Sequence, residues 1–256
     1  FIKALSKKFN SPISLLVKES SKADQYLSET KYIDKIIILE RDKKNNSRHD
    51  GILGIFNMIK DLRSHRFNKI FIFNSSLRFN LIAKFSNIPE IFQYPLFSKN
   101  KQHIVNTPKK FLKDKLNIDI FEDPDIQVDN ILVTNAAKKF LINNEETNVL
   151  LGIGGSGSTK RIPANIFLKF MRELIKKKNC KFFLATGKSI EEQKILNEIL
   201  NSELKNLCIP LDNLSIKEIL PIIKNCDISI CNDTGFSHLS AALGIKTITL
   251  MADTPL

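Results

Sequence analysis

Residues 226–254 (CDISICNDTGFSHLSAALGIKTITLMADT) constrain the fold most, because their pattern predicts a strand, a sharp turn, a short helix and a second strand. The run 227–231 is short and mostly apolar, which is typical of a strand buried on both faces. A polar turn interrupts it: Asn232, Asp233, Thr234 and Gly235. Thr234 is a good N-cap, since its hydroxyl can accept from a free backbone N–H one turn on. The helix 236–243 and the strand 245–251 follow.

This unit predicts a ligand site at the turn. A helix that begins at the carboxyl end of a parallel strand presents free N–H groups, which favour an anion such as a phosphate. His238 lies within the first turn of that helix, where it could share the ligand. An ordinary βαβ unit with a buried polar turn explains the same stretch equally well.

Strands alternate with helices along the rest of the chain, which predicts parallel sheets in an α/β protein. The expected strands are 13–17, 35–39 and 69–73 in the first half, and 149–152, 181–185 and 207–209 in the second. Residues 90–108 are expected to form a long irregular loop. A polar stretch around 143–148 places the predicted domain boundary between 144 and 145, giving domains 1–144 and 145–256.

The ends of the sequence suggest a fragment. Residues 1–9 have helical periodicity with no cap before them, so the first strand of the fold is expected to be missing. Leu256 comes just after a strand, so truncation is also considered at that end.

The net charge of +12 is uneven. Residues 1–144 hold 25 Lys and Arg against 15 Asp and Glu, whereas residues 145–256 hold 14 against 12. A basic first half favours an anionic partner. Such a partner could be an acidic glycolipid, a membrane surface or nucleic acid. A lysine-rich composition throughout the chain would give the same excess without any ligand.

Composition also limits the class of protein. No run of about 18 apolar residues predicts a membrane span, and no signal peptide is recognised. The four cysteines have no metal-binding spacing, and they are expected to be small buried hydrophobic residues in a reducing cytosol.

A glycine-rich loop follows the strand 149–152. Its letters GIGGSG match GxGxxG, which suggests a dinucleotide. Two features count against a dinucleotide site. The next helix is expected near Pro163, too far beyond Gly157 for the glycines to pack at its first turn. The next strand ends in Thr186-Gly187-Lys188, where such a site would have a ribose-binding acid. A P-loop fails too, because Ser158 occupies the lysine position. The loop with Thr159, Lys160 and Arg161 suits a diphosphate, and a flexible lysine-rich linker is the alternative.

Glu191 and Glu192 begin the helix after the strand 181–185. Carboxylates are favoured there by the helix dipole in any case, but one of them could also accept both hydroxyls of a ribose. The glycine-rich loop, this acidic pair and the turn at Asp233 follow strands of one predicted sheet, so they should line one edge. Together they predict a site for a nucleotide diphosphate.

Two motifs resemble a known family. The segment GIGGSGSTKRIP and the run NDTGFSHLSAALGIKTITL are similar to glycosyltransferase family 9, the bacterial lipopolysaccharide heptosyltransferases. The first half of the chain resembles this family more loosely, through the segment NSSLRFNLIAKF and residues 103–118. The resemblance implies a GT-B fold, in which two Rossmann-like domains with parallel sheets face each other across a cleft. It also implies an inverting transfer that needs no metal and no cofactor, with ADP-heptose as the usual sugar donor.

The resemblance also assigns residues. The donor would contact Thr159, Lys160, Glu191, Glu192, Asp233, Thr234, Gly235, His238 and Thr254. The acceptor, an anionic lipopolysaccharide or another lipid-linked sugar, would contact Asn74, Ser75, Arg78, Lys99 and Lys101. This implies a cytoplasmic protein without a nucleic-acid partner, located peripherally on the inner face of the cytoplasmic membrane.

Two departures from the family pattern matter. Residues 252–256 read ADTPL where the family has Gly-Pro-Thr-Asp-Pro, so the choice of sugar stays open. The family's catalytic base is an Asp after the first strand, and that position is expected before Phe1. Two other functions also fit the sequence: a nicotinamide-dependent enzyme that uses GxGxxG, and a non-catalytic basic module that binds nucleic acid.

Overall fold

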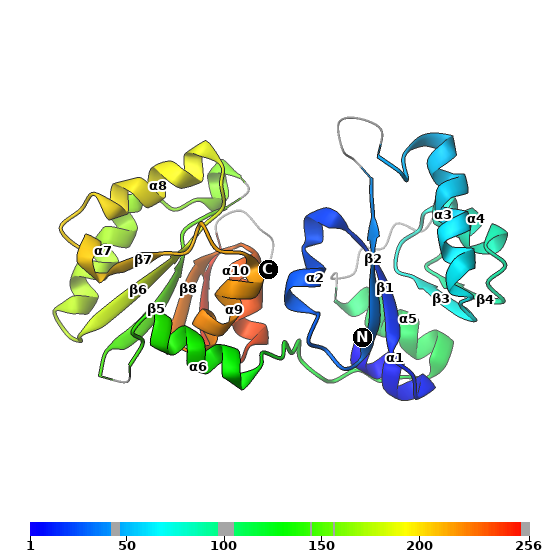
Figure 1. Ribbon diagram of the computed structural model, residues 1–256, viewed down its shortest axis with the longest axis horizontal. Coiled ribbons are helices and arrows are strands. Elements are labelled where there is room, and N and C mark those ends of the chain that lie inside the picture. The colour runs from blue at the N-terminus through cyan, green and yellow to red at the C-terminus, as the bar shows by residue number, and fades with distance from the viewer. Residues whose placement is uncertain (42–46, 97–104, 144, 156, 252–256) are drawn as a thin grey trace. The chain divides into compact units, whose positions relative to one another are not determined.

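The computed structural model describes residues 1–41, 47–96, 105–143, 145–155 and 157–251 (Figure 1). Lys99, Lys101 and Thr254 therefore lie outside the described residues. The chain divides into two compact units, and each is an α/β assembly with parallel strands. The first unit consists of Phe1–Ala23 and Lys31–Glu122, and the second consists of Asp24–Thr30 and Asp123–Leu256.

The second unit is built on a five-stranded sheet with the order β7-β6-β5-β8-β9, in which every pair is parallel. Its strands are β5 (Thr147–Gly152), β6 (Cys180–Ala185), β7 (Cys208–Pro210), β8 (Ile228–Asn232) and β9 (Lys246–Leu250). β5 lies in the centre, where a strand must be apolar on both faces. Its residues 148–152 are all buried, as the apolar run in the sequence predicts.

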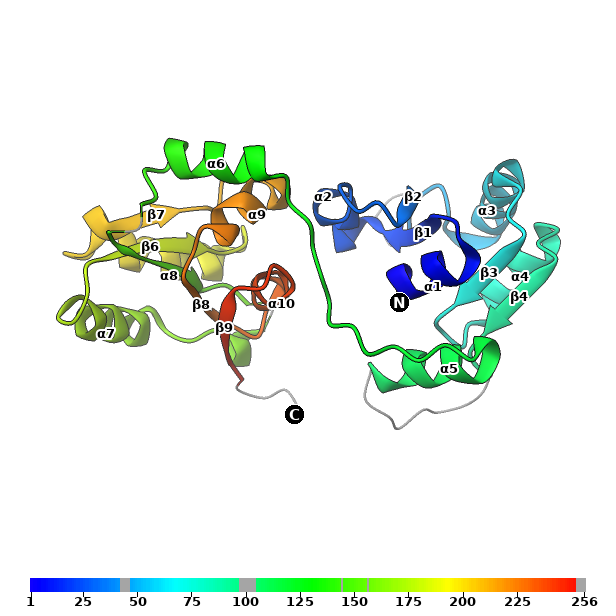
Figure 2. The ribbon, with the colours of Figure 1, turned by 90° about the horizontal axis from the view of Figure 1, so that it is seen from below.

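Helices cover both faces of this sheet (Figures 1 and 2). One core cluster joins the sheet to α7 (Ala164–Ile175) and α8 (Ile190–Leu200). The other joins it to α6 (Asn130–Lys139), α9 (Ile216–Lys224) and α10 (Gly235–Ala242).

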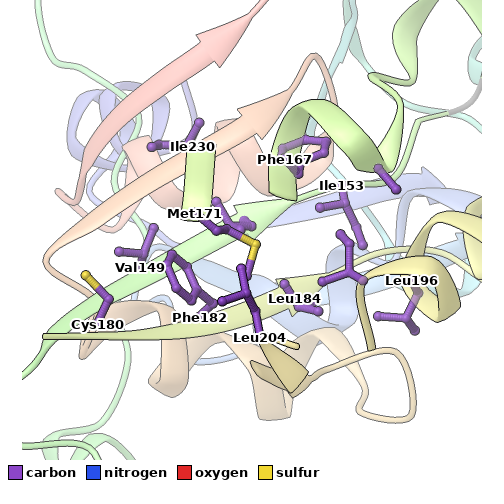
Figure 3. Close-up of a cluster of buried hydrophobic side chains, with 13 residues drawn as sticks. Val149, Ile153, Phe167, Met171, Cys180, Phe182, Leu184, Leu196, Leu204 and Ile230 are labelled. Atoms are coloured by element: carbon purple, nitrogen blue, oxygen red, sulfur yellow. The ribbon is translucent and has the colours of Figure 1, made fainter. Parts of the chain in front are cut away.

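Alternation along the strands divides the apolar side chains between these two clusters. Phe182 and Leu184 of β6 pack into the first cluster, which Figure 3 shows, and Phe183 packs into the second. All three are fully buried. Each such side chain stabilises the fold by about 1.5–3 kcal/mol relative to an exposed position.

The first unit contains two separate two-stranded parallel sheets within the described residues. β1 (Ile13–Lys18) pairs with β2 (Ile33–Leu39), and β3 (Lys69–Ile72) pairs with β4 (Glu90–Gln93). Its helices are α1 (Ile2–Phe9), α3 (Gly51–His65), α4 (Leu77–Phe85) and α5 (Asn106–Leu116). The short helix α2 (Ala23–Tyr26) begins at Ala23 of the first unit, but its other residues belong to the second unit.

The strand β4 differs from the sequence-based expectation, which is an irregular loop over residues 90–108. The strand is only four residues long and lies between Pro89 and Pro95. So short a segment carries no recognisable alternation. Its pairing with β3, from Lys69 opposite Glu90 onward, supplies the hydrogen bonds that define it.

The division into units also differs from the predicted boundary after residue 144. The second unit already begins at Asp123, because α6 packs against α9. Ala136 of α6 is buried in the core of the second unit, and Asn225 Nδ2 donates to the carbonyl of Val133 over 2.9 Å. The segment 24–30 belongs there as well, since Gln25 Oε1 accepts from the backbone N–H of Ile216.

Candidate functional site

The three predicted turns lie together at the carboxyl edge of the second sheet. β5 lies between β6 and β8, and Gly152 is opposite Ala185 on one side and Cys231 on the other. The strands therefore end at the same level, and the segments after them are neighbours. Open α/β sheets bind ligands at this edge.

An ion pair connects two of these segments. A short 3-10 helix, η2 (Ser158–Lys160), follows the glycine-rich loop, and Lys160 Nζ lies 2.6 Å from Asp233 Oδ2 in the turn after β8. The lysine side chain is 30% exposed and the carboxylate 13% exposed. The pair therefore stands at the surface of the sheet edge, with the cation as the more accessible partner.

Asn232 fixes the turn after β8 to the loop after β5. Its side chain is fully buried, and Nδ2 donates to the carbonyls of Ile153 (3.1 Å) and Gly154 (3.0 Å). From its sequence alone, Asn232 is expected only to interrupt the strand. A polar side chain at the last position of a buried strand is a signal for such a role, because buried polar groups need hydrogen-bond partners.

Three buried oxygen atoms at this edge have no hydrogen-bond partner within the described ranges. They are Thr186 Oγ1, Asn232 Oδ1 and Thr234 Oγ1, each from the end of a strand or the turn that follows it. Leaving a buried polar atom unpaired costs about 1–3 kcal/mol. A group of them at the ligand edge of a sheet is consistent with a site that a polar ligand completes.

Thr234 corrects the expectation that its hydroxyl caps the helix. It does occupy the N-cap position of α10, with φ −142° and ψ 172°, but its side chain makes no capping hydrogen bond among the residues the structure describes. Its hydroxyl therefore does not satisfy the first-turn N–H groups. Gly235 begins α10, and His238 is exposed one turn along the helix. An anion would be favoured at this helix start.

The Glu192 carboxylate accepts hydrogen bonds from other groups of the protein. Its Oε1 accepts from the backbone N–H groups of Gly155 (2.9 Å) and Gly187 (3.3 Å), and its Oε2 accepts from the Ser189 hydroxyl (2.8 Å) and backbone N–H (3.3 Å). Ser189 and Glu192 thereby form a capping box for α8. Glu192 joins the loop after β5 to the loop after β6, while Glu191 is exposed beside it.

The environment of Glu192 shifts its pKa. Burial by itself would raise the pKa, but the hydrogen bonds from Ser189, Gly155 and Gly187 favour the charged form and lower it below the ordinary value. Glu192 is therefore an anion that holds two loops. Its assignment as a ribose ligand stays a prediction, as does that of Glu191.

Two glycines allow this arrangement by lacking a side chain. A Cβ on Gly154 would lie 2.5 Å from Glu192 Oε1, and one on Gly187 would lie 2.4 Å from Oε2. The glycines thus make room for a carboxylate. The dinucleotide alternative is not supported, because α7 begins only at Ala164 and Gly157 is not at its first turn.

The remaining cationic residues of the loop have different roles. Arg161 Nη1 donates to the carbonyl of Gly155 over 2.9 Å, so this guanidinium helps to hold the glycine-rich loop. Thr159 is exposed within η2. Of the two predicted cations, Lys160 is the one paired with the acid of the neighbouring turn.

The predicted acceptor residues that are described lie in the first unit. Asn74 Oδ1 accepts from the backbone N–H of Ser76 in the turn after β3, and Ser75 is exposed there. Arg78 donates from Nη1 to the carbonyl of Gly51 (3.0 Å) and from Nη2 to that of His49 (2.7 Å). Arg78 therefore fixes the start of α3, a role that the sequence did not indicate.

Three further observations concern metals, cysteines and membranes. No group of three His, Cys, Asp or Glu able to hold a metal occurs among the described residues. Cys180, Cys226 and Cys231 are buried free thiols, and burial raises the pKa of the half-buried Cys208 to about 11. No helix in the described part of the chain is long and apolar enough to cross a membrane.

The chain has two α/β units with parallel strands, and the second is a doubly wound sheet with its site at the carboxyl edge. This architecture defines a protein of GT-B type. Residues 92–256 match the family model described as glycosyltransferase family 9 (heptosyltransferase), and the chain belongs to this family.

Known proteins of this kind are similar to the chain. Lipooligosaccharide heptosyltransferase 2 of Campylobacter jejuni is 31% identical over 172 residues, which are 62% of this chain and 50% of that protein. The chain thus spans about half the length of the curated relatives it matches.

Solved structures share the fold. ADP-heptose lps heptosyltransferase II of E. coli has a TM-score of 0.72 at 18% identity, covering 97% of this chain and 78% of that one. A family 9 glycosyl transferase from Veillonella parvula has a TM-score of 0.78 at 17% identity, covering 100% and 77%. The GT-B fold expected from the sequence is confirmed.

Proposed function

We propose that this chain binds an ADP-sugar at the carboxyl edge of its second sheet and acts in the transfer of a heptose to a lipopolysaccharide acceptor. Membership of glycosyltransferase family 9 supports the class of reaction. The names of the similar proteins, lipooligosaccharide and ADP-heptose heptosyltransferases, support the choice of sugar, nucleotide and acceptor.

One observation carries the proposal: Lys160 is held 2.6 Å from Asp233, in the turn that leads into α10. Departure of ADP from the sugar builds negative charge on the diphosphate. An ammonium group and a helix N-terminus placed beforehand would stabilise that charge without a divalent ion. We therefore propose an inverting displacement that requires no metal, with Lys160 and the α10 N-terminus at the leaving group.

The acceptor half of the proposal rests on charge and on family. Residues 1–144 carry most of the net positive charge, which suits a phosphorylated, lipid-linked sugar. Asn74, Ser75 and Arg78 are the described candidates for contacting it, and Arg78 also donates to two carbonyls at the start of α3. Such an acceptor would place the protein in the cytoplasm, peripherally on the inner face of the membrane.

Calorimetry with the chain separates the candidate functions. We expect saturable binding of ADP that is unchanged by EDTA, and weaker binding of NAD. Binding that disappears in EDTA would contradict independence from metal, and preference for NAD would favour the nicotinamide alternative. Nucleic-acid binding with a steep salt dependence and no ADP binding would favour the basic module.

A further inference from the structure

An apolar surface outside the nucleotide site lies on two neighbouring helices of the first unit. Six large apolar side chains are exposed on them, and together they are called the α3–α4 face: Ile52, Leu53 and Phe56 on α3, and Leu77, Leu81 and Phe85 on α4. Leu53 is 78% exposed and Phe56 64% exposed. Leu77, Leu81 and Phe85 are four residues apart, so they form one stripe along α4.

These side chains are not the core face of the helices. Met58, Ile59 and Leu62 of α3 and Ile82 of α4 are buried together in a separate hydrophobic cluster. Both helices are therefore apolar toward the core and apolar again toward solvent. A surface helix of a globular protein normally carries polar residues on its outer side, so the exposed stripe requires its own explanation.

Hydrogen bonds hold the two helices next to each other at both ends. Arg78, at the start of α4, donates to the carbonyl of Gly51 at the start of α3. Arg63, near the end of α3, donates from Nε to the carbonyl of Phe85 at the end of α4 over 2.9 Å. The two helices thus run side by side in the same direction, as Figures 1 and 2 also show. The exposed stripes therefore lie on two neighbouring helices.

The charged residues around this face are mainly basic. Lys60 and Arg63 on α3 and Lys84 on α4 are exposed, and by helical spacing they lie on the same side as Phe56 and Leu81. The acid within α3, Asp61, is engaged by Arg48 at 2.5 Å and by His49 at 3.1 Å. Asp50, the N-cap of α3, lies 3.8 Å from Arg41, so the net charge of the described residues next to the apolar stripes is positive.

We infer that the α3–α4 face docks on an anionic phospholipid membrane. Leucine, isoleucine and phenylalanine side chains on one side of paired helices can enter the boundary between headgroups and acyl chains. Lysine and arginine beside them are attracted to the negative surface of the leaflet. Positive charge next to apolar residues selects an anionic membrane over a neutral partner surface. This inference rests on the peripheral membrane location of the proposed function and names the face responsible for it. It concerns the first unit only, so vesicle binding can fail while ADP binding by the second unit is retained.

Sedimentation with vesicles tests the inference. The chain is incubated with large vesicles of phosphatidylcholine, either pure or mixed with phosphatidylglycerol, and the bound fraction is measured after centrifugation. We expect binding to the mixed vesicles that decreases at high salt, and little binding to pure phosphatidylcholine. Phe56→Ser with Leu81→Ser should reduce the partition coefficient by about tenfold or more, because two apolar anchors are lost. Lys60→Gln with Lys84→Gln should reduce it by about tenfold.

Matched controls lie on the second unit. Ile131→Ser removes a similarly exposed apolar side chain from α6, and Lys138→Gln with Lys194→Gln removes two exposed lysines elsewhere. These variants should bind vesicles like the parent chain. Circular dichroism and ADP calorimetry show whether every variant is folded, so that loss of vesicle binding with ADP binding retained is specific to the face.

Three results would overturn the inference. One is that the parent chain does not sediment with anionic vesicles, and another is that the face variants sediment as well as the controls. The third is that light scattering finds a dimer without vesicles that the change at Phe56 and Leu81 dissociates, which would make the face a contact between two copies of the chain.

Discussion

Lys160 Nζ and Asp233 Oδ2 are 2.6 Å apart, although 73 positions separate the two residues in the chain. Adjacent parallel strands bring them together, because β5 and β8 are hydrogen-bonded neighbours that end at the same level. The cation predicted to hold a diphosphate is thus already paired with a carboxylate. A phosphate that enters the site would compete with Asp233 for Lys160, and this competition gives two predictions.

The first prediction concerns the cation. Lys160→Met should weaken ADP binding by roughly ten- to a hundredfold, because a charge-assisted contact contributes about 1.5–3 kcal/mol. Adenosine has no phosphate, so its binding should be unchanged. Calorimetry with both ligands measures the difference. Lys188→Met is the matched control, since Lys188 contacts Asn213 and Asp212 instead. Equal losses for ADP and adenosine would show that Lys160 supports the fold and not the ligand.

The second prediction concerns the acid. Asp233→Asn keeps an oxygen that can accept from Lys160 but removes a negative charge next to the incoming diphosphate. ADP binding should therefore become roughly three- to tenfold tighter, the effect expected for removing one repulsive charge near a surface. The same titration measures it, and the gain should shrink at high salt. Weaker ADP binding by this variant would indicate that Asp233 mainly positions Lys160.

Much of the second unit could be predicted from its sequence. β5, β6 and β8 are apolar runs followed by polar turns, and their common edge follows from the parallel arrangement. The sequence therefore predicts that Lys160, Asp233 and Thr234 lie near each other. What could not be predicted is which polar groups bind ligand and which bind the protein. Glu192 and Arg161 are used internally, and that depends on backbone groups whose positions only the fold determines.

The first unit was predicted less completely, because its signals are shorter and its contacts more distant. β4 is too short for a periodic pattern, and its identity depends on pairing with β3. Arg78 looked like a cation available to an anionic acceptor, yet it donates to two carbonyls at the start of α3. The same limitation explains why the division into units differs from the predicted boundary, since the packing of α6 on α9 involves residues far apart in sequence.

The third prediction tests the loop contacts of Glu192. Glu192→Ala should lower the free energy of unfolding by about 1–3 kcal/mol, because the backbone N–H groups of Gly155 and Gly187 lose their acceptor. Urea unfolding measures the change. Glu191→Ala removes an exposed carboxylate from the same helix turn and should change stability by no more than about 0.5 kcal/mol. Similar losses for both variants would mean that only the helix dipole matters at this position.

The fourth prediction is the pH dependence of the same contact. The pKa of Glu192 is lowered in the folded chain, so the charged form is favoured by folding. Its contribution to stability is complete above the ordinary glutamate value of 4.5 and is lost as the pH falls through the lowered folded value. The difference in unfolding free energy between the parent chain and Glu192→Gln should therefore shrink below pH 4.5. A difference that grows in acid would contradict the lowered pKa.

The fifth prediction concerns the hydroxyl of Thr234, which is buried at the start of α10 and has no hydrogen-bond partner within the described residues. Thr234→Val keeps the shape of the side chain and replaces the hydroxyl with a methyl group. The fold loses no hydrogen bond by this change, so the unfolding free energy should stay within about 0.5 kcal/mol of the parent or rise. If the hydroxyl contacts the bound diphosphate, ADP binding should weaken by roughly fivefold, the equivalent of one hydrogen bond.

Ser240 provides the control for this test, because its hydroxyl is also buried and unpartnered in the described structure but lies further along α10. Ser240→Ala should likewise leave stability nearly unchanged, and it should leave ADP binding unchanged too. Thermal unfolding measures the stability of both variants, and calorimetry measures their affinity for ADP. If Thr234→Val unfolds more easily by well over 1 kcal/mol, the hydroxyl serves the fold. If it is stable and binds ADP like the Ser240 variant, the hydroxyl makes no contact with the nucleotide, and the candidate site must be centred elsewhere on the sheet edge.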